Sequence, residues 1–146
     1  MDGSEGFTST VRAPLMTEIL QRWQEIAPLL KHATDRSEGC YEPEDILGLL
    51  FGGRATMLLV ERGSTLVVVA VVELRNYPRR RVLDVGFIGG KLGETNLKEW
   101  VPVFVEHLEN MARACGATML SGCGRIGWAR AARWRLAGGF VTHKVQ

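Results

Sequence analysis

Two glycine-rich stretches near the C-terminal end decide the fold: Gly124-Arg125-Ile126-Gly127-Trp128 and Ala137-Gly138-Gly139-Phe140. The first is typical of a strand that ends in a glycine turn and leads into a short basic helix. The glycine pair in the second predicts that this helix, expected over residues 127–137, stops before a last strand at residues 140–144. The C-terminal part therefore predicts a helix between two strands, as in α/β domains.

Three strands are expected in the middle of the chain, at residues 56–61, 65–74 and 82–88. Short connections join them, which predicts an antiparallel meander. Residues 66–72 show no alternation of apolar and polar side chains, so the middle strand is expected to be buried on both faces of the sheet. Gly89-Gly90 is expected to end the third strand.

The clearest helical pattern follows, from Leu97 to Cys115, where apolar residues recur along one face. Thr95 or Asn96 is expected to cap its start and Gly116 its end, before a strand at residues 117–121. A strand, a helix and a second strand in this order predict a right-handed parallel crossover.

The N-terminal part predicts helices. Residues 1–12 are interpreted as a polar segment, and residues 13–146 as one domain. An apolar stripe from Leu15 to Leu30 predicts a helix, which Pro28 is expected to kink or end near Ala27. Residues 33–42 are interpreted as a loop. Pro43-Glu44-Asp45 is expected to open a short helix that Gly52-Gly53 stops.

Composition limits the class of protein. The chain has 146 residues, 46% of them hydrophobic and 23% charged, with a formal net charge of +2. These values are ordinary for a globular domain, and the longest apolar run is too short for a membrane helix. Three cysteines without a CxxC pair favour reduced thiols and a cytoplasmic location. The three histidines have no metal-binding spacing, so no metal site is expected.

Several local motifs together carry a family resemblance. They are Tyr77-Pro78-x-x-Arg81-Val82-Leu83, Leu108-Glu109-x-x-Ala112-x-x-x-Gly116-Ala117, Gly124-Arg125-x-Gly127-Trp128 and Gly139-Phe140. With the order of elements, this set resembles the GNAT acetyltransferase superfamily, in the divergent branch that phages and prophages often encode. The resemblance implies a mixed, mostly antiparallel central sheet with helices on both faces.

The resemblance also implies a site for acetyl-CoA. In the family, two neighbouring strands diverge, the thioester lies between them against exposed backbone, and a glycine-rich turn holds the pyrophosphate. The corresponding cofactor-binding residues here are Phe87, Ile88, Gly89, Gly90, Lys91, Gly93 and Arg125. The usual spacing of this turn is altered, and a flexible capped loop is the competing interpretation. For Arg125 the competing role is structural, tying the helix start to the sheet.

Catalytic residues follow the family pattern only in part. The tyrosine that commonly protonates the departing thiolate is replaced by Arg135, which could stabilise thiolate charge but is a poor proton donor. Asp84 and Glu73, both on expected strands, are the candidates for a general base. The competing interpretation is that each carboxylate pairs with a neighbouring arginine, such as Arg75 or Arg81.

Three functions stay open at this point. The first is transfer of an acetyl group from acetyl-CoA to the amine of a small molecule or peptide. The second is a non-catalytic GNAT-fold phage protein that is either virion-associated or regulatory. In both of these cases the protein could form a homodimer or bind a phage structural partner. The third is nucleic-acid binding by the arginine-rich C-terminal helix with Trp128 and Trp134, although no recognised motif supports it.

Overall fold

The computed structural model describes residues 8–91, 96–122, 135–137 and 140–145, and within these it has one seven-stranded sheet. The strand order is β1-β2-β3-β4-β5-β7-β6, and only β4 and β5 run parallel to each other. The strands are β1 (Ser9–Arg12), β2 (Thr56–Arg62), β3 (Thr65–Asn76), β4 (Arg81–Gly90), β5 (Met119–Gly122), β6 (Arg135–Ala137) and β7 (Phe140–Lys144). The mixed, mostly antiparallel sheet confirms the predicted fold class.

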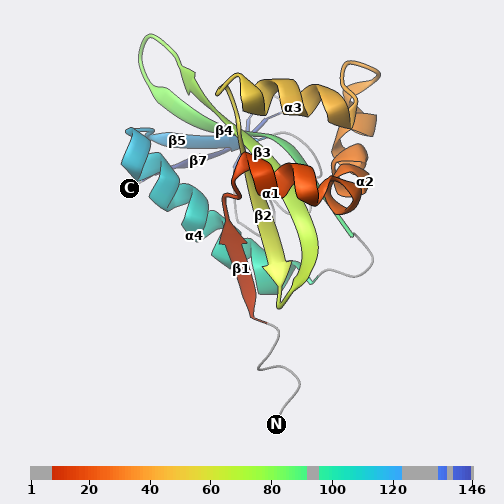
Figure 1. The fold of residues 1–146 in the computed structure, drawn as a ribbon. Coiled ribbons are helices and arrows are strands. Elements are labelled where there is room, and N and C mark those ends of the chain that lie inside the picture. Colours follow the sequence, from red (N-terminus) through yellow and green to blue (C-terminus); the bar gives the residue numbers. More distant parts are fainter. Residues whose placement is uncertain (1–7, 92–95, 123–134, 138–139, 146) are drawn as a thin grey trace.

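Helices cover both faces of the sheet (Figure 1). The first face carries α1 (Met16–Gln21), α2 (Trp23–Thr34) and α3 (Pro43–Phe51), with the short 3-10 turn η1 (Asp35–Ser37) after α2. The opposite face carries α4 (Leu97–Cys115), which crosses from β4 to β5. No helix in the described part of the chain is long and apolar enough to cross a membrane.

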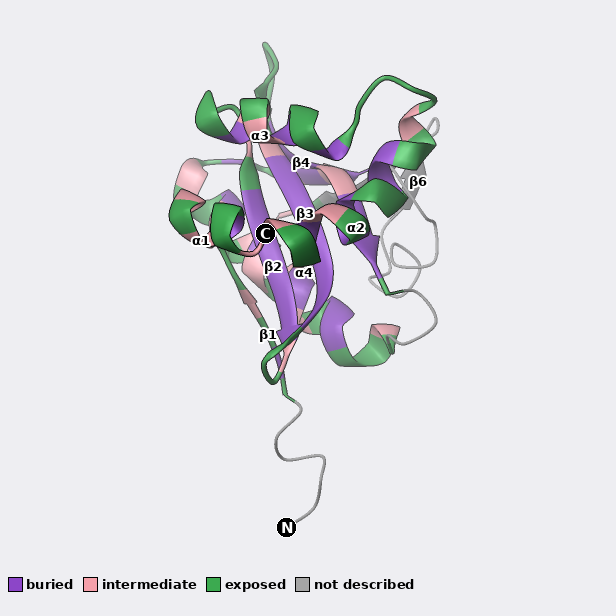
Figure 2. Cartoon of the chain, turned by 45° about the vertical axis from the view of Figure 1, so that its right-hand side comes forward, coloured by how far each residue is buried: buried purple, intermediate pink, exposed green. Residues whose placement is uncertain are grey.

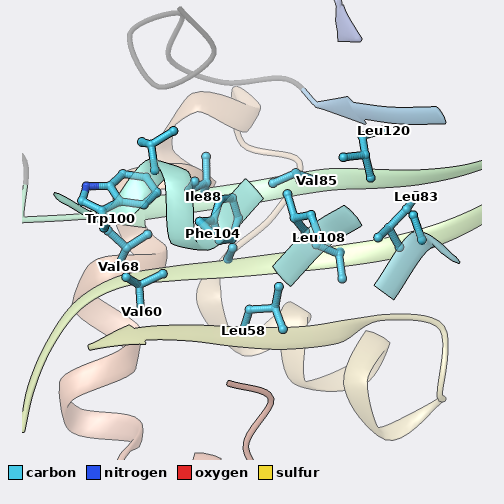
Figure 3. Close-up of a cluster of buried hydrophobic side chains, with 14 of the residues drawn as sticks. Leu58, Val60, Val68, Leu83, Val85, Ile88, Trp100, Phe104, Leu108 and Leu120 are labelled. Atoms are coloured by element: carbon cyan, nitrogen blue, oxygen red, sulfur yellow. The ribbon is translucent and has the colours of Figure 1, made fainter. Parts of the chain in front are cut away.

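Each face has its own hydrophobic core (Figure 2). On the α4 side, Trp100, Phe104 and Leu108 pack against sheet residues that include Val85 and Leu120 (Figure 3). On the other side, α1, α2 and α3 bury side chains from the alternate positions of β2 and β3. A strand between two such layers is apolar on both faces, which confirms the prediction for the middle strand.

The N-terminal region differs from the prediction in two ways. The helical stretch breaks at Arg22 (φ −103°, ψ 15°), whereas Pro28 lies inside α2, which continues to Thr34. A proline within a helix removes one hydrogen bond, but the buried residues Ile26 and Leu30 hold this helix against the sheet. The predicted end of the helix near Ala27 is therefore wrong.

The second difference is β1, an edge strand in a segment expected to be polar and without a strand. It pairs antiparallel with β2. Arg12 of β1 bonds Glu61 of β2 (Nε–Oε1 2.7 Å) and also Glu18 of α1. Arg22 reaches Glu61 (3.1 Å) and Glu18 (3.1 Å), so one ion-pair network joins the strand, its neighbour and the first two helices. Tertiary ion pairs of this kind leave no periodic signal in a sequence.

The caps agree with the sequence. Glu42 and Asp45 form a capping box at the start of α3, and Gly53 follows its end with φ 73°. The Asn96 side chain accepts a hydrogen bond from the Lys98 amide at the start of α4. Gly116 ends α4 in the left-handed conformation (φ 76°), which favours glycine.

The C-terminal prediction is corrected in part. The helix expected over residues 127–137 is wrong for its last three positions, because Arg135–Ala137 form β6. The strand expected at residues 140–144 is confirmed as β7. The remaining positions of that helix, including Trp128 and Trp134, lie outside the described residues.

Candidate functional site

The pairing between β4 and β5 stops halfway along β4. The parallel ladder runs from Val82 opposite Met119 to Val85 opposite Gly122, where β5 ends. β4 continues beside β3 as far as Gly90. Residues 87–90 thus pair with β3 on one side, and no described strand pairs with their other side. We call residues 87–90 the one-sided stretch of β4.

A bulge marks the start of this stretch. Val71 lies opposite Phe87 and Val72 lies opposite Val85, so Gly86 is an additional residue in β4. A β-bulge bends the strand and increases its twist. The bend occurs one residue beyond the last β4–β5 pair.

Backbone alternation decides which groups face the side away from β3. The Lys91 amide donates to the Val67 carbonyl (3.1 Å), so Lys91 and Val67 are a hydrogen-bonded pair. Counting back in steps of two, Gly89 and Phe87 direct their backbone groups towards β3, and Ile88 and Gly90 direct theirs away. The Arg36 guanidinium donates to the Ile88 carbonyl (2.7 Å), which agrees with a carbonyl that points away from β3. Of the predicted cofactor-binding residues Phe87 and Ile88, Ile88 therefore directs its backbone amide to the open side, and Phe87 directs its amide to β3.

Gly89 and Gly90 are the last two residues of β4, so the strand ends at the predicted glycine pair. The expected turn does not include them, because both still pair with β3. Each is needed for close packing. A Cβ atom on Gly89 would lie 2.0 Å from the Leu29 carbonyl oxygen of α2, and one on Gly90 would lie 2.7 Å from the Val67 carbonyl oxygen. Their role in cofactor binding stays a prediction.

Among the other predicted cofactor residues, Lys91 is exposed directly after β4. The hydrogen bond from Arg22 is the main cause that lowers the pKa of Glu25 in α2, and the positive charge of Lys91 adds to this effect. Gly93 and Arg125 lie outside the described residues.

The three predicted catalytic residues share one row across the sheet. Glu73, Asp84, Ser121, Thr142 and Arg135 are successive Cα partners through β3, β4, β5, β7 and β6. Adjacent strands lie about 4.8 Å apart, so the backbone of Arg135 is about 14 Å from that of Asp84. The register brings the two carboxylates together and places Arg135 three strands away.

Asp84 is a buried carboxylate with two partners. Its Oδ1 accepts from the Ser121 hydroxyl (2.7 Å), and its Oδ2 accepts from Arg75 Nε (3.3 Å). A Cβ atom on Gly86 would lie 3.7 Å from Oδ2, so Asp84 lies directly beside the bulge. Asp84 therefore forms an ion pair with an arginine, Arg75, which was the competing interpretation to a catalytic role.

Arg81 does not join these carboxylates. It binds the Asn76 side chain (2.7 Å) and the Cys115 carbonyl (2.6 Å), and so ties the β3–β4 connection to the end of α4. Glu73 is half-buried on β3, opposite Asp84. Two carboxylates with one nearby arginine can accept a proton from a substrate amine.

Tyr41 is the residue that sequence reasoning missed. It lies between η1 and α3, and its ring stands edge-on to that of Phe87, with centroids 5.1 Å apart. Ser37 holds this position by accepting from the Tyr41 amide (3.0 Å). Arg36, in the same segment, binds Ile88. The segment between α2 and α3 therefore contacts two successive residues of the one-sided stretch, Phe87 and Ile88. The residues in contact are 46 or more positions apart in the sequence, so no local pattern could predict these contacts.

In the comparison with known proteins, no family model and no curated protein matches the sequence. Several of the solved structures that match are acetyltransferases. A GNAT family acetyltransferase from Brucella melitensis in complex with acetyl-CoA superposes with a TM-score of 0.64 at 14% identity, covering 96% of this chain and 90% of that one. The ribosomal-protein-S18-alanine N-acetyltransferase from Escherichia coli gives 0.65 at 10% identity, covering 95% of each chain.

A third structure agrees with these two. The apo form of a mutant agmatine N-acetyltransferase gives a TM-score of 0.66 at 11% identity, covering 93% of this chain and 99% of that one. At such low identity the likeness establishes the architecture and no individual residue role. The chain has the GNAT fold.

Proposed function

We propose that this protein is an N-acetyltransferase that takes its acetyl group from acetyl-CoA. The observation that carries the proposal is the one-sided stretch of β4, where the parallel ladder ends at Val85 and a bulge follows. Backbone donors on one side of a strand can bind an extended polar ligand as a missing strand would. Two solved structures of this fold contain acetyl-CoA.

The residues present fit the thioester end of such a cofactor. Acetyl-CoA supplies an activated acetyl group, so the protein needs to hold it beside an amine. The Ile88 amide, which points away from β3, is placed to donate to the thioester carbonyl. Gly90, two residues further on, offers a second backbone amide on the same side. Lys91, Gly93 and Arg125 stay predictions for the phosphate groups.

Asp84 and Glu73 are proposed to receive the proton of the amine. Both lie on one register row, and Asp84 is next to the bulge that begins the one-sided stretch. The positive charge of Arg75, which forms an ion pair with Asp84, offsets part of the negative charge of the two carboxylates. A base that acts through one bound water needs no direct contact with the amine. Stabilisation of the thiolate by Arg135 stays a prediction.

The test is binding followed by turnover. Acetyl-CoA at 100 times its dissociation constant is expected to stabilise the fold by about 2.7 kcal/mol, which a thermal-shift assay detects as a rise of several degrees. The purified protein is then offered a panel of small primary amines and peptides, and release of free CoA is measured. Asp84→Asn is expected to retain acetyl-CoA binding and to lose about 10²-fold in turnover. Absence of any thermal shift contradicts the proposal.

A non-catalytic GNAT-fold protein is the second candidate. Two observations favour it: the Ile88 carbonyl already accepts from Arg36, and Asp84 already has Ser121 and Arg75 as partners. This candidate predicts no thermal shift with acetyl-CoA and co-purification with another protein. The phage-type branch, a homodimer and a cytoplasmic location stay predictions, which genome neighbours, light scattering and cell fractionation respectively test.

A further inference from the structure

The end of the β3–β4 hairpin is an exposed and strongly basic surface. Residues 74–81, which we call the basic hairpin, contain four arginines and no acidic residue, whereas the formal net charge of the whole chain is +2. Every residue of the basic hairpin is exposed, and the segment projects beyond the helices (Figure 1). A projecting surface with one sign of charge attracts a partner of the opposite charge.

The four arginines divide into two with structural roles and two without. Arg75 forms the ion pair described above, and Arg81 supports the base of the hairpin. Arg79 and Arg80 form no ion pair with any residue that the structure describes, and Arg80 makes one long contact with the Met119 sulfur (3.5 Å). Their guanidinium groups are therefore available to bind an anion, and arginine binds phosphate and carboxylate groups through paired hydrogen bonds.

Hydrogen bonds hold the basic hairpin in shape. The Tyr77 amide donates to the Arg80 carbonyl across the turn (2.9 Å). At the base, Arg81 donates to the Cys115 carbonyl at the end of α4 (2.6 Å), and its own carbonyl accepts from the Thr118 amide (3.0 Å). A surface that already has its shape loses less conformational entropy when a ligand binds.

An aromatic ring lies among these charges. Tyr77 has 53% of its surface exposed, and its ring stacks on no other aromatic ring of the described residues. In proteins that bind single-stranded nucleic acids, arginines bind the phosphates and exposed aromatic rings stack on the bases. An acidic peptide would use the arginines and leave the ring without a role. The ring therefore favours a nucleic acid, and one whose bases are not already paired.

We propose that the basic hairpin binds single-stranded nucleic acid, with Arg79 and Arg80 on phosphate groups and Tyr77 stacked on a base. This inference does not depend on the proposed acetyl transfer, because none of the three side chains belongs to the proposed cofactor-binding or catalytic residues. It also differs from the sequence-based hypothesis of a C-terminal helix, whose Trp128 and Trp134 lie outside the described residues.

The first test measures affinity and its dependence on salt. Labelled strands of about 12 nucleotides, one of oligo-U RNA and one of oligo-dT DNA, are titrated with the protein and followed by fluorescence anisotropy. The wild type is expected to bind at least one of them with a Kd of about 1–100 μM. Each phosphate contact on a single strand contributes about −0.7 to the slope of log K against log salt. Arg79→Gln/Arg80→Gln is therefore expected to reduce the slope by about 1.4 and to weaken binding at low salt about tenfold.

The second test separates the ring from the charges. Tyr77→Ala is expected to weaken binding about tenfold, whereas Tyr77→Phe, which keeps the ring, is expected to match the wild type. The matched control for charge is Lys31→Gln/Lys98→Gln, which removes two exposed positive charges outside the hairpin and is expected to change the affinity less than twofold. Thermal midpoints equal to that of the wild type confirm that each variant is folded.

Four results would overturn the inference. These are no binding of either strand at low salt, wild-type affinity in Arg79→Gln/Arg80→Gln, wild-type affinity in Tyr77→Ala, and tighter binding of a labelled polyglutamate peptide than of both strands. The last result would identify the partner as an acidic protein segment. The acetyl-CoA thermal-shift assay is independent of all four, so the proposed function stands or falls separately.

Discussion

Replacing Gly89 by alanine is expected to destabilise the protein strongly, because α2 crosses β4 at this residue. The added Cβ atom would lie 2.0 Å from the Leu29 carbonyl oxygen, whereas ordinary contacts begin at 3.4 Å. Relief requires α2 to move by about 1.4 Å, since the obstructing atoms are backbone. Such a movement loosens Ile26 and Leu30, both fully buried. Overpacking typically costs about 1–3 kcal/mol, and we expect the upper end, about 3 kcal/mol.

Urea unfolding followed by circular dichroism measures this cost. With a slope of about 2 kcal/mol/M, the midpoint is expected to fall by roughly 1.5 M. The matched control is Gly48→Ala in α3, where a Cβ atom meets nothing within 4 Å. This control is expected to gain about 0.5–1 kcal/mol, because alanine favours a helix more than glycine does.

The same experiment distinguishes two explanations for Gly89. If glycine is needed here for helix packing, stability falls with the substitution. If it were needed only for close approach of a cofactor, Gly89→Ala would keep its urea midpoint and lose acetyl-CoA binding. An unchanged midpoint would refute the reasoning from α2.

Three further substitutions test other parts of the structure. Hydrogen bonds from Arg12 and then Arg22 lower the pKa of Glu18 from its usual 4.5 to about 2, so the stability that this shift provides is present above pH 4.5 and is lost as the pH falls towards 2. Glu18→Gln is therefore expected to flatten the dependence of the urea midpoint on pH between these values. An unchanged dependence on pH would contradict the ion-pair network. Ser121→Ala removes the hydroxyl that donates to Asp84 and is expected to cost about 2 kcal/mol in urea unfolding; a cost below about 0.5 kcal/mol would mean that water replaces the hydroxyl. Gly116→Ala places a side chain at φ 76° and 3.2 Å from Arg81 Nη1, and is expected to lower stability by about 1 kcal/mol; a thermal midpoint equal to that of the wild type would contradict the strained cap.

The elements that sequence reasoning predicted are those with a local cause. The apolar stripe of α4, with Trp100, Phe104 and Leu108 at helical spacing, needs only one buried face to be recognised. Asn96 and Gly116 cap this helix through their own chemistry. The apolar run in β3 predicted a central strand for the same reason, because burial on both faces leaves no polar alternation.

The elements that it did not predict depend on partners distant in the sequence. β1 is a strand because the edge of β2 accepts it and Glu61 binds Arg12. Gly89 looks like a turn residue by composition, whereas its real constraint is the backbone of α2. The contact of Tyr41 with Phe87 joins residues 46 positions apart. In each case the deciding interaction is tertiary, so no window of sequence contains it.

The central claim is that residues 87–90 of β4 bind acetyl-CoA through the backbone that faces away from β3. Amide hydrogen exchange, resolved by residue with NMR, tests it directly. The Phe87 amide points to β3 and is expected to be protected with or without cofactor, whereas the Ile88 amide is expected to gain at least tenfold protection when acetyl-CoA is added. Unchanged exchange at Ile88 under saturating acetyl-CoA would contradict the account.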